Sequence, residues 1–327
     1  MTRKEIVKRA IHFQHPERIP EFFFSGNADN SDVVKVDVEN WHMGPNNDEV
    51  EWGFVWNNAE GDKTDMGTPK EYILADWSKF ENYKKNIAPD PFRKGRFDKV
   101  QKTDFKDCYR LGSLFISGFS VMMLLRGFEN VLMDMYDNPE RVYALADLVF
   151  GIENDIIRQM KEQGFDGVFL LDDWGMQKSM MISPELWEKF FMDYYKKQFQ
   201  LAHDLGMDVL YHTCGYVYPI IQKLIDIGVD IINLGQADLN DMALLKENFK
   251  GKVCFCQPIN YQTTGISGTK EQIFAEARDI VDTFSDERGG LLIELLDFNG
   301  MGWEPKDPKN NEYQFQAFKE LLYVHGQ

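Results

Sequence analysis

From about residue 107 onward, short apolar segments alternate with helical patterns, and this alternation restricts the possible folds more than any other feature of the sequence. Strand–helix alternation sustained over about 190 residues is typical of a parallel sheet or barrel. A further strand is expected at residues 18–24 (RIPEFFF). The six later strands are predicted within residues 107–115, 167–174, 208–215, 230–235, 252–259 and 291–298.

Seven predicted strands favour a (β/α)8 barrel of the TIM type, an α/β fold, over an open doubly wound sheet. The helix signals agree, because Asn138 and Ser183 each precede a proline in the pattern of a helix N-cap. No Gly-x-Gly-x-x-Gly or phosphate-loop motif follows a strand, which weakens the case for a nucleotide-binding sheet.

The whole chain of 327 residues is predicted to be a single barrel domain with two parts. Residues 107–327 hold the regular β/α units, whereas residues 1–106 form an irregular N-terminal extension that includes the first strand. Within this extension residues 52–72 read as a hairpin, with Gly61 and Gly67 as turn formers. We expect the extension to cover the mouth of the barrel.

The chain carries 53 acidic and 36 basic residues, which gives a formal net charge of −17. Such a surface repels phosphate backbones and anionic lipid, so we expect neither nucleic acid nor a membrane as a partner. The N-terminal segment lacks an apolar signal region, and no apolar run approaches the roughly 18 residues of a spanning helix. Four cysteines are too few for a disulfide framework here, so we expect a cytoplasmic protein with reduced thiols.

Polar and ligand-type side chains follow five consecutive predicted strands, at the ends where barrel enzymes carry their reactive groups. Any one set is compatible with a structural role, but five in succession indicate a functional face. The sets are Asp172, Asp173, Trp174 and Gln177; Tyr211, His212 and Cys214; Gln236 and Asp238; Cys256 and Asn260; and Glu294 and Asp297.

His212 and Cys214 stand two residues apart where the segment DVLYHTCG ends. Residues i and i+2 of a strand point to the same side, so both side chains are expected to face one site. Imidazole and thiolate are both good zinc ligands. The alternative is a buried histidine beside a small apolar thiol, because free cysteine packs like a hydrophobic residue.

Several segments of the chain carry a family resemblance. They are residues 15–20 (HPERIP), 125–140 (LRGFENVLMDMYDNPE), 172–191 (which begins DDWGMQ and ends ISPELWEKFF), 212–236 (HTCGYVYPIIQKLIDIGVDIINLGQ) and 257–262 (QPINYQ). These segments resemble the uroporphyrinogen decarboxylase-like superfamily, and within it the corrinoid-dependent methyltransferases. The segment at 212–236, with its His-x-Cys-Gly motif, is the most specific. The resemblance covers nearly the whole chain and implies an α/β barrel, in agreement with the strand pattern.

Two activities of that superfamily imply different sites. The decarboxylases resemble a metal-free pocket in which an arginine-rich N-terminal loop and an aspartate hold a porphyrinogen. The corresponding loop here, residues 21–34, contains no arginine, although a ligand with several carboxylates needs several fixed bases. The methyltransferases resemble a zinc enzyme with a His-x-Cys pair and one later thiolate. His212 and Cys214 match the first two of these positions.

The third zinc ligand departs from the family pattern, because no cysteine follows the last predicted strand. Cys256 and Glu294 are the leading candidates, with Asp297 behind them. Cys256 shares a face with Cys254 and lies nearer the C-terminal end of their strand. Glu294 is a carboxylate inside an apolar run and therefore needs a partner. The alternatives are two small thiols in the core and an acid paired with a neighbouring base.

The resemblance implies that zinc acts together with a cobalt corrinoid (cobalamin). The chain has no Asp-x-His-x-x-Gly segment of the cobalamin-binding type, so the corrinoid is expected on a partner protein. We predict a methyltransferase that moves a methyl group between a methoxylated aromatic substrate and this corrinoid, which is an O-demethylation. Asp172 or Asp173 is the predicted catalytic acid, because one of two adjacent carboxylates can have a raised pKa; the alternative is a helix N-cap and a solvent-facing acid. The predicted substrate-binding residues are Trp174, Gln177, Tyr211, Gln236 and Asn260.

Other functions also fit the sequence. Aromatic residues make up 14% of the chain and suit either an aromatic substrate or an ordinary core. The alternatives are a methylcobalamin:thiol methyltransferase, a uroporphyrinogen-type decarboxylase, and a non-catalytic barrel that binds a metal or ligand. The metal content of the purified protein separates the zinc enzymes from the other two classes.

Overall fold

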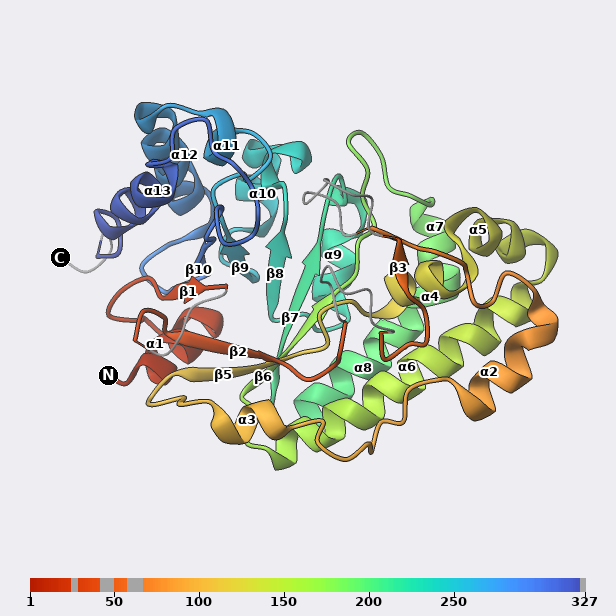
Figure 1. Ribbon diagram of the computed structural model, residues 1–327. Helices are drawn as coiled ribbons and strands as arrows, with labels where there is room; N and C mark the ends of the chain where they lie inside the picture. The colour runs from red at the N-terminus through yellow and green to blue at the C-terminus, as the bar shows by residue number, and fades with distance from the viewer. Residues whose placement is uncertain (25–28, 42–49, 58–66, 324–327) are drawn as a thin grey trace.

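A computed structural model describes residues 1–24, 29–41, 50–57 and 67–323, and its main sheet is a nearly closed barrel of eight parallel strands (Figure 1). This confirms the predicted TIM-type architecture. Around the barrel the strands follow one another in chain order; β2 and the later strands pair with their neighbours in this order, and β1 pairs with β10. They are β1 (Glu21–Phe23), β2 (Val33–Asp37), β5 (Tyr109–Ser113), β6 (Gly167–Leu171), β7 (Asp208–Thr213), β8 (Ile231–Leu234), β9 (Cys254–Gln257) and β10 (Leu291–Leu295).

Helices follow most of the later strands and pack on the outside of the barrel (Figure 1). None of the helices in the described part of the chain combines the length and the apolar character that a membrane crossing requires. After β5 come α4 (Gly118–Arg126), α5 (Phe128–Asp137) and α6 (Pro139–Glu162); after β6, α7 (Pro184–Trp187), the π-helical turn η2 (Glu188–Met192) and α8 (Asp193–Asp204); then α9 (Tyr218–Asp226), η3 (Ala237–Asn240), α10 (Met242–Phe249), α11 (Thr264–Ser267), α12 (Lys270–Phe284) and α13 (Asn310–Lys319).

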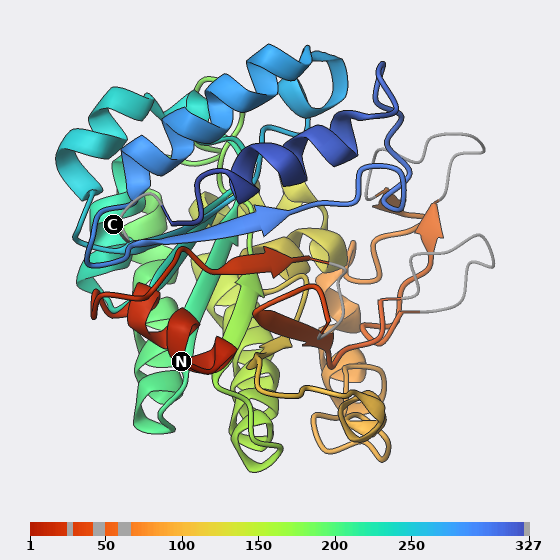
Figure 2. The ribbon, with the colours of Figure 1, turned by 90° about the vertical axis from the view of Figure 1, so that its left-hand side faces the viewer.

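The helix α1 (Arg3–Ile11) precedes the barrel and lies beside β1 and β10 (Figure 2). Its C-terminal end approaches β10 closely, because Gly290 N donates to Ala10 O over 2.9 Å. Its N-terminal end approaches β5, because Lys4 N donates to Asp107 O over 2.8 Å. These contacts involve residues just before the two strands, so α1 closes the end of the barrel opposite the strand ends that were predicted to be functional.

The strand β2 was not predicted, and it is the eighth strand of the barrel. Its sequence, VVKVD, is short and follows a polar passage rich in Asn and Asp, and the prediction assigned no strand there. β1 and β2 complete the circle without a strand ladder in the described part of the chain. Two residues before β2 close this seam: Phe23 N donates to Ser31 Oγ over 3.0 Å, and Glu21 N donates to Asp32 Oδ2 over 2.8 Å.

The N-terminal extension contains β3 (Trp56–Asn57), which pairs in antiparallel fashion with β4 (Thr68–Pro69), as the predicted hairpin requires. Gly61 lies outside the described residues. The remaining elements are η1 (Trp77–Lys79), α2 (Phe80–Asn86) and α3 (Asp98–Lys102). The extension is fixed beyond the end of β5, since Trp41 Nε1 donates to Leu114 O over 2.9 Å. Its closure over the mouth stays a prediction, because parts of it lie outside the described residues.

The strand register decides which side chains enter the barrel. Leu171, His212, Asn233 and Cys256 are direct partners on β6 to β9, and paired residues of parallel strands point to the same side. The ring of Phe169, two residues before Leu171, lies 6.3 Å from the imidazole of His212 and therefore shares this side. All of these residues line the inner face of the barrel.

Candidate metal centre

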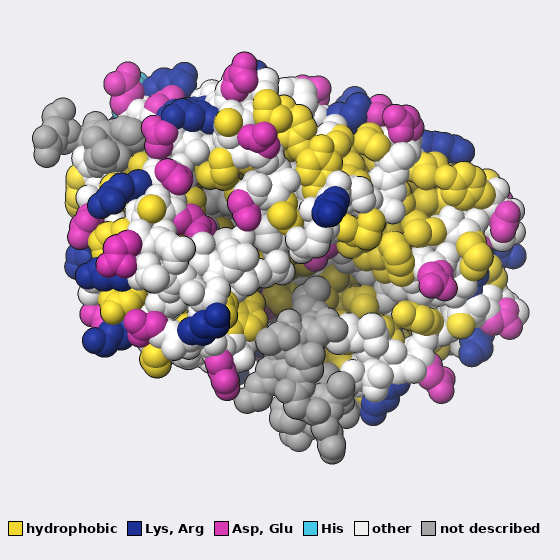
Figure 3. Space-filling model, turned by 90° about the horizontal axis from the view of Figure 1, so that it is seen from above, with side chains coloured by type: hydrophobic (Ala, Val, Ile, Leu, Met, Phe, Trp, Pro, Cys, Tyr) yellow, Lys and Arg dark blue, Asp and Glu magenta, His cyan; other side chains and the backbone are white. Residues whose placement is uncertain are grey.

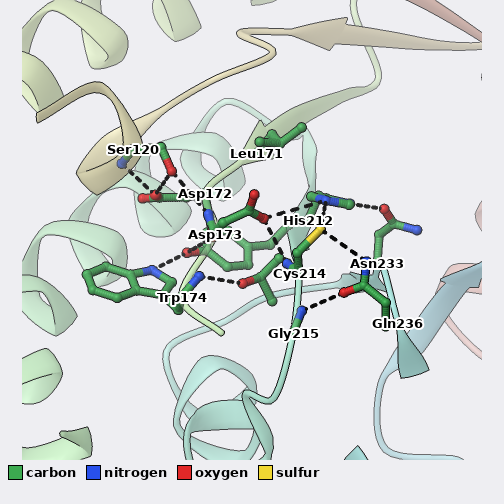
Figure 4. A network of polar contacts seen from close by, with 12 residues as sticks. Ser120, Leu171, Asp172, Asp173, Trp174, His212, Cys214, Gly215, Asn233 and Gln236 are labelled. Carbon is green, nitrogen blue, oxygen red and sulfur yellow. Dashed lines mark hydrogen bonds and ion pairs between the residues drawn. The ribbon is translucent and has the colours of Figure 1, made fainter. Parts of the chain in front are cut away.

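Three potential metal ligands meet where β6 and β7 end: Asp173, His212 and Cys214 (Figure 4). One ligand atom from each residue lies within 4.8 Å of the other two. His212 Nε2 is 3.3 Å from Cys214 Sγ and 3.7 Å from Asp173 Oδ1. All three side chains are partly buried. The sequence predicted His212 and Cys214 as metal ligands and Asp173 as a catalytic acid, and the structure brings the three together.

The turn after β7 is held against the loop after β6. Cys214 N donates to Asp173 Oδ1 over 2.8 Å, so the main chain of one ligand fixes the carboxylate of another. Gly215 has φ +78°, which favours glycine, and a Cβ there would meet Gly175. A Cβ on Gly175 would in turn lie 2.4 Å from Cys214 O. The two glycines therefore allow the backbone contact that aligns Asp173 with Cys214.

The orientation of His212 is set by a buried amide. Asn233 Nδ2 donates to Cys256 O over 2.5 Å and to Glu294 Oε2 over 2.8 Å, so its Oδ1 must face the histidine. His212 Nδ1 therefore carries a hydrogen and donates it to Asn233 Oδ1. Nε2, on the side of Asp173 and Cys214, is therefore the nitrogen that can take up either a second proton or a metal ion. Metal-binding histidines in proteins are oriented in this way.

The electrostatic surroundings of His212 favour positive charge. Burial alone would lower the pKa of the imidazole, but the adjacent Cys214, Asp173 and Asn233 outweigh burial and raise this pKa to about 10. Groups that hold a proton so firmly also favour a divalent cation in its place. Burial raises the pKa of Glu294, although His212, Asn233 and Lys35 oppose the increase.

Tyr261 and Gly235 lie beside the thiol of Cys214. Tyr261 OH is 3.5 Å from Cys214 Sγ and accepts a hydrogen bond of 3.2 Å from Gln236 Nε2. The Tyr261 ring stacks on Trp303 with 4.8 Å between ring centroids. A Cβ on Gly235 would lie 2.6 Å from both Cys214 Sγ and Tyr261 OH. Glycine at position 235 therefore lets Cys214 Sγ and Tyr261 OH lie closer to this backbone than a residue with a side chain would allow. Of the predicted substrate-binding residues, Gln236 is the one that reaches this cluster.

Asp172 is placed differently from the prediction. Its carboxylate is fully buried and accepts hydrogen bonds from Phe119 N, Ser120 N and Ser120 Oγ, each of 2.8 Å, and from Tyr195 OH. It therefore binds the first N–H groups of α4 on the outside of the barrel. Adjacent strand residues point to opposite faces, so only one of the two aspartates can reach His212 and Cys214.

The three predicted candidates for the third ligand lie elsewhere. Glu294 bonds Asn233, which separates it from His212 by one amide. Cys256 is fully buried on the inner face, and burial raises the pKa of its thiol, which disfavours the thiolate that a metal requires. Asp297 is exposed and accepts from Gly300 N. In the described part of the chain, the group containing His212 and Cys214 has Asp173 as its third member.

Four predicted substrate-binding residues also lie away from the cluster. Trp174 is fully buried outside the barrel, where it stacks on Phe119 at 4.3 Å. Tyr211 is buried next to it, and Trp174 Nε1 donates to Tyr211 OH over 2.9 Å. Gln177 is exposed in the loop after β6, and Asn260 Nδ2 donates to Asp238 Oδ1. Trp174 and Tyr211 are each next in sequence to a cluster residue, Asp173 and His212, and therefore point to the outer face of the barrel.

Asn233, Gly235 and Tyr261 were not predicted as parts of the site. Asn233 offered a signal, because an amide inside the apolar strand IINL needs buried partners. Gly235 and Tyr261 lie beyond strand ends, where the path of the loop decides their position. Seen from above, the end of the barrel that carries these residues is hollowed, with hydrophobic side chains gathered around the hollow (Figure 3).

Comparisons with known proteins agree with this fold. The family model described as uroporphyrinogen decarboxylase (URO-D) matches residues 100–295. A methyltransferase from Methanosarcina mazei has a similar structure, with a TM-score of 0.51 and 17% sequence identity; the match covers 69% of this chain and 62% of that chain, which is less than two thirds of its length. A D-psicose 3-epimerase matches with a TM-score of 0.42 and 10% identity over 91% of this chain and 90% of the other. No curated protein matches the sequence significantly.

The region that matches the family model covers more than half of the chain. It includes β5 to β10 and contains the cluster of Asp173, His212 and Cys214 together with Asn233 and Glu294. The likeness to the Methanosarcina mazei methyltransferase, at 17% sequence identity, supports a shared fold and nothing finer. On the strength of the family match, the chain belongs to the uroporphyrinogen decarboxylase (URO-D) family.

Proposed function

We propose that this protein is a zinc-dependent methyltransferase that transfers the methyl group of a methoxylated aromatic substrate to a cobalt corrinoid on a partner protein. The observation that carries the proposal is the cluster of Asp173, His212 and Cys214, whose ligand atoms lie within 4.8 Å of one another. Three protein ligands with an open fourth position are typical of catalytic zinc sites. The His-x-Cys-Gly resemblance around His212 supports the methyltransferase branch over the decarboxylases.

The residues present fit a zinc ion. The imidazole presents Nε2 to the cluster, the thiol is adjacent, and the carboxylate is fixed by Cys214 N. Gly235 has no side chain, which lets Cys214 Sγ and Tyr261 OH approach its backbone. Zinc bound there would act as a Lewis acid on the ether oxygen. A carboxylate ligand in place of a second thiolate makes the donor set harder, which favours an oxygen ligand from the substrate over a sulfur ligand.

The chain's own groups can assist the leaving oxygen. In the overall reaction the bond between oxygen and methyl carbon breaks, the methyl group bonds to cobalt(I), and a proton from water neutralises the phenolate. Tyr261 OH, 3.5 Å from Cys214 Sγ, is positioned to donate a hydrogen bond to that oxygen. The stacked rings of Tyr261 and Trp303 beside it supply an apolar wall that limits water.

Metal analysis provides the first test. Purified wild-type protein should bind one equivalent of zinc, and Cys214→Ala should lose most of it. Cys108→Ala is the matched control, because Cys108 is buried outside the cluster and should leave the zinc content unchanged. Zinc binding that survives Cys214→Ala would contradict the site.

The reaction itself needs a second test. The zinc-loaded protein is mixed with a reduced corrinoid protein and, in separate samples, methoxybenzenes, methanol, methylamines and methyl thiols. We expect methyl-cobalt absorbance to grow with the methoxyaromatics and to depend on Cys214. Growth with another donor would keep the methyltransferase and reject the ether. Carbon dioxide release from a porphyrinogen, with no methyl transfer, would favour the decarboxylase.

A further inference from the structure

The end of the barrel opposite the candidate metal centre carries a second group of potential metal ligands. Its members are His12 at the C-terminal end of α1, Asp208, the first residue of β7, and Asp230, the residue before β8. One ligand atom from each residue lies within 4.8 Å of the other two. Asp208 and His212 are four residues apart on β7, so the two groups are about 13 Å apart and cannot share an ion.

The spacing of these ligand atoms suits a single ion. His12 Nε2 is 3.0 Å from Asp208 Oδ1. Neighbouring ligand atoms about 2.1 Å from a common ion in octahedral coordination also lie about 3.0 Å apart. One imidazole and two carboxylates, with no thiol, form a harder donor set than the group that contains Cys214. They favour ions such as Mn²⁺, whose charge the two carboxylates balance.

Supporting groups hold both carboxylates in place. Asp208 Oδ2 accepts a hydrogen bond of 2.7 Å from Tyr109 OH. Asp230 Oδ2 accepts one of 2.7 Å from Val209 N, and His203 Nε2 lies 2.7 Å from the same oxygen. Each carboxylate therefore keeps its Oδ1 clear of these supporting contacts. Carboxylates that bind metals in proteins are commonly oriented by hydrogen bonds of this kind.

The group is accessible from solvent at one side. The side chain of His12 is 40% exposed, whereas those of Asp208 and Asp230 are 12% and 20% exposed. Lys8, one turn earlier on α1, places a positive charge near His12 and Asp208 and opposes a cation there. Without a thiolate ligand and with this open side, the group should lose its ion during purification. The zinc content of the purified protein then reports on the group that contains Cys214.

We propose that His12, Asp208 and Asp230 form a second cation site, which takes a divalent ion of the Mn²⁺ type and ties α1 to the starts of β7 and β8. The site goes beyond the proposed function, because it lies at the other end of the barrel and takes no part in methyl transfer. The ion takes the place of the proton between His12 and Asp208 and adds a link to Asp230. Because the unfolded chain lacks this arrangement, bound Mn²⁺ should raise the melting temperature.

The test uses the zinc-loaded protein and Mn²⁺ alone as the probe. The electron paramagnetic resonance signal of free Mn²⁺ falls when the ion binds, so a titration gives both the stoichiometry and the affinity. We expect one Mn²⁺ per chain and a higher melting temperature in the wild type, and the same in Cys214→Ala. His12→Gln changes a half-exposed side chain and should fold normally. It should weaken Mn²⁺ binding by more than the about 10–100-fold that loss of a supporting residue costs, and should remove the rise in melting temperature.

Two further variants separate a coordinated ion from general attraction to an acidic surface. Asp204→Asn removes an exposed charge near His203 but outside the group, and should weaken binding by no more than about fivefold. Lys8→Gln removes the opposing charge and should tighten binding. An unchanged Mn²⁺ signal with the wild type, or equal binding by the wild type and His12→Gln, would overturn the proposal and leave His12 and Asp208 as an ion pair. Binding that is lost in Cys214→Ala would place the ion at the other end of the barrel and overturn it as well.

Discussion

Asp172 and Asp173 are consecutive residues whose carboxylates lie on opposite sides of the strand end of β6. Asp173 Oδ1 accepts from Cys214 N inside the cluster, whereas Asp172 accepts from Phe119 N and Ser120 N at the start of α4 (Figure 4). One carboxylate therefore belongs to the candidate metal site and the other holds a helix to the barrel. The same substitution at the two positions should have separable effects.

Asp173→Asn should weaken zinc binding, and Asp172→Asn should destabilise the fold. An asparagine at 173 still accepts from Cys214 N but is a poor zinc ligand, so the loss should exceed the about 10–100-fold that a supporting residue costs. An asparagine at 172 leaves part of the four hydrogen bonds unmade, at a cost of about 1–3 kcal/mol. Zinc titration and thermal melting of both variants measure this contrast. Normal zinc affinity in Asp173→Asn would remove it from the site.

Gly235→Ala should push the side chains of Cys214 and Tyr261 away from residue 235. The added Cβ would lie 2.6 Å from Cys214 Sγ and Tyr261 OH, so one or both must move. Because both are side-chain ends, we expect the protein to fold and to lose activity and zinc affinity together. Cobalt(II) in place of zinc gives a thiolate absorption band that reports on the geometry at Cys214. An unchanged band and unchanged activity would show that the site does not need the close approach of Cys214 Sγ and Tyr261 OH to residue 235.

Asn233→Leu should loosen the metal site through His212. The variant removes the acceptor of the Nδ1 hydrogen and frees the imidazole to rotate, so zinc affinity should fall about 10–100-fold. Ile232→Val on the same strand is the control, because Ile232 is buried and points to the opposite face; it should cost about 0.5–1.5 kcal/mol of stability and leave zinc affinity unchanged. A stability loss in Asn233→Leu without weaker zinc binding would reject the positioning role.

Glu153 should make stability depend on pH. This residue of α6 is fully buried; burial raises its pKa to about 7, against hydrogen bonds from Gln198 and Gly118 N. Because the folded-state pKa exceeds that of the unfolded chain, its stabilising effect is complete below about pH 4.3 and is lost as the pH rises through about 7.

The comparison variant is Glu153→Gln, which cannot titrate. We expect the wild type to lose more melting temperature than this variant between about pH 5 and about pH 8. Parallel melting curves for the two proteins across that range would show that Glu153 stays charged or stays neutral throughout.

The fold followed from local pattern wherever a strand was apolar throughout, as in GVFLL and DVLY. β2 was missed because VVKVD is a short segment inside a polar passage. Its alternation is compatible with a strand but does not tell an inner-face lysine from a surface one. The prediction of a barrel did not depend on finding this strand, because the other seven already favoured a (β/α)8 barrel over an open sheet.

The sequence predicted which strand ends carry the site, but not which side chains there point to the inner face of the barrel. His212 and Cys214 stand two residues apart and do lie together, 3.3 Å between Nε2 and Sγ. Whether Asp172 or Asp173 joined them depended on the register of β6 against β7, which no local pattern contains. The amide of Asn233 between His212 and Glu294 likewise arises from three strands that are distant in sequence. Such relationships are set by packing and not by spacing.

The seam between β1 and β2 is the place where we expect the barrel to open first by local unfolding. Elsewhere adjacent strands share a continuous ladder, but here the contact depends on Ser31 and Asp32, and Arg18 holds Asp32 in place with two hydrogen bonds of 2.6 and 2.7 Å. Amide protons of β1 should exchange with solvent sooner than those of β7. The wall that opens first would then be the one formed by β1 and β2. Opening there would leave β6 and β7 paired, so the cluster of Asp173, His212 and Cys214 would keep its geometry.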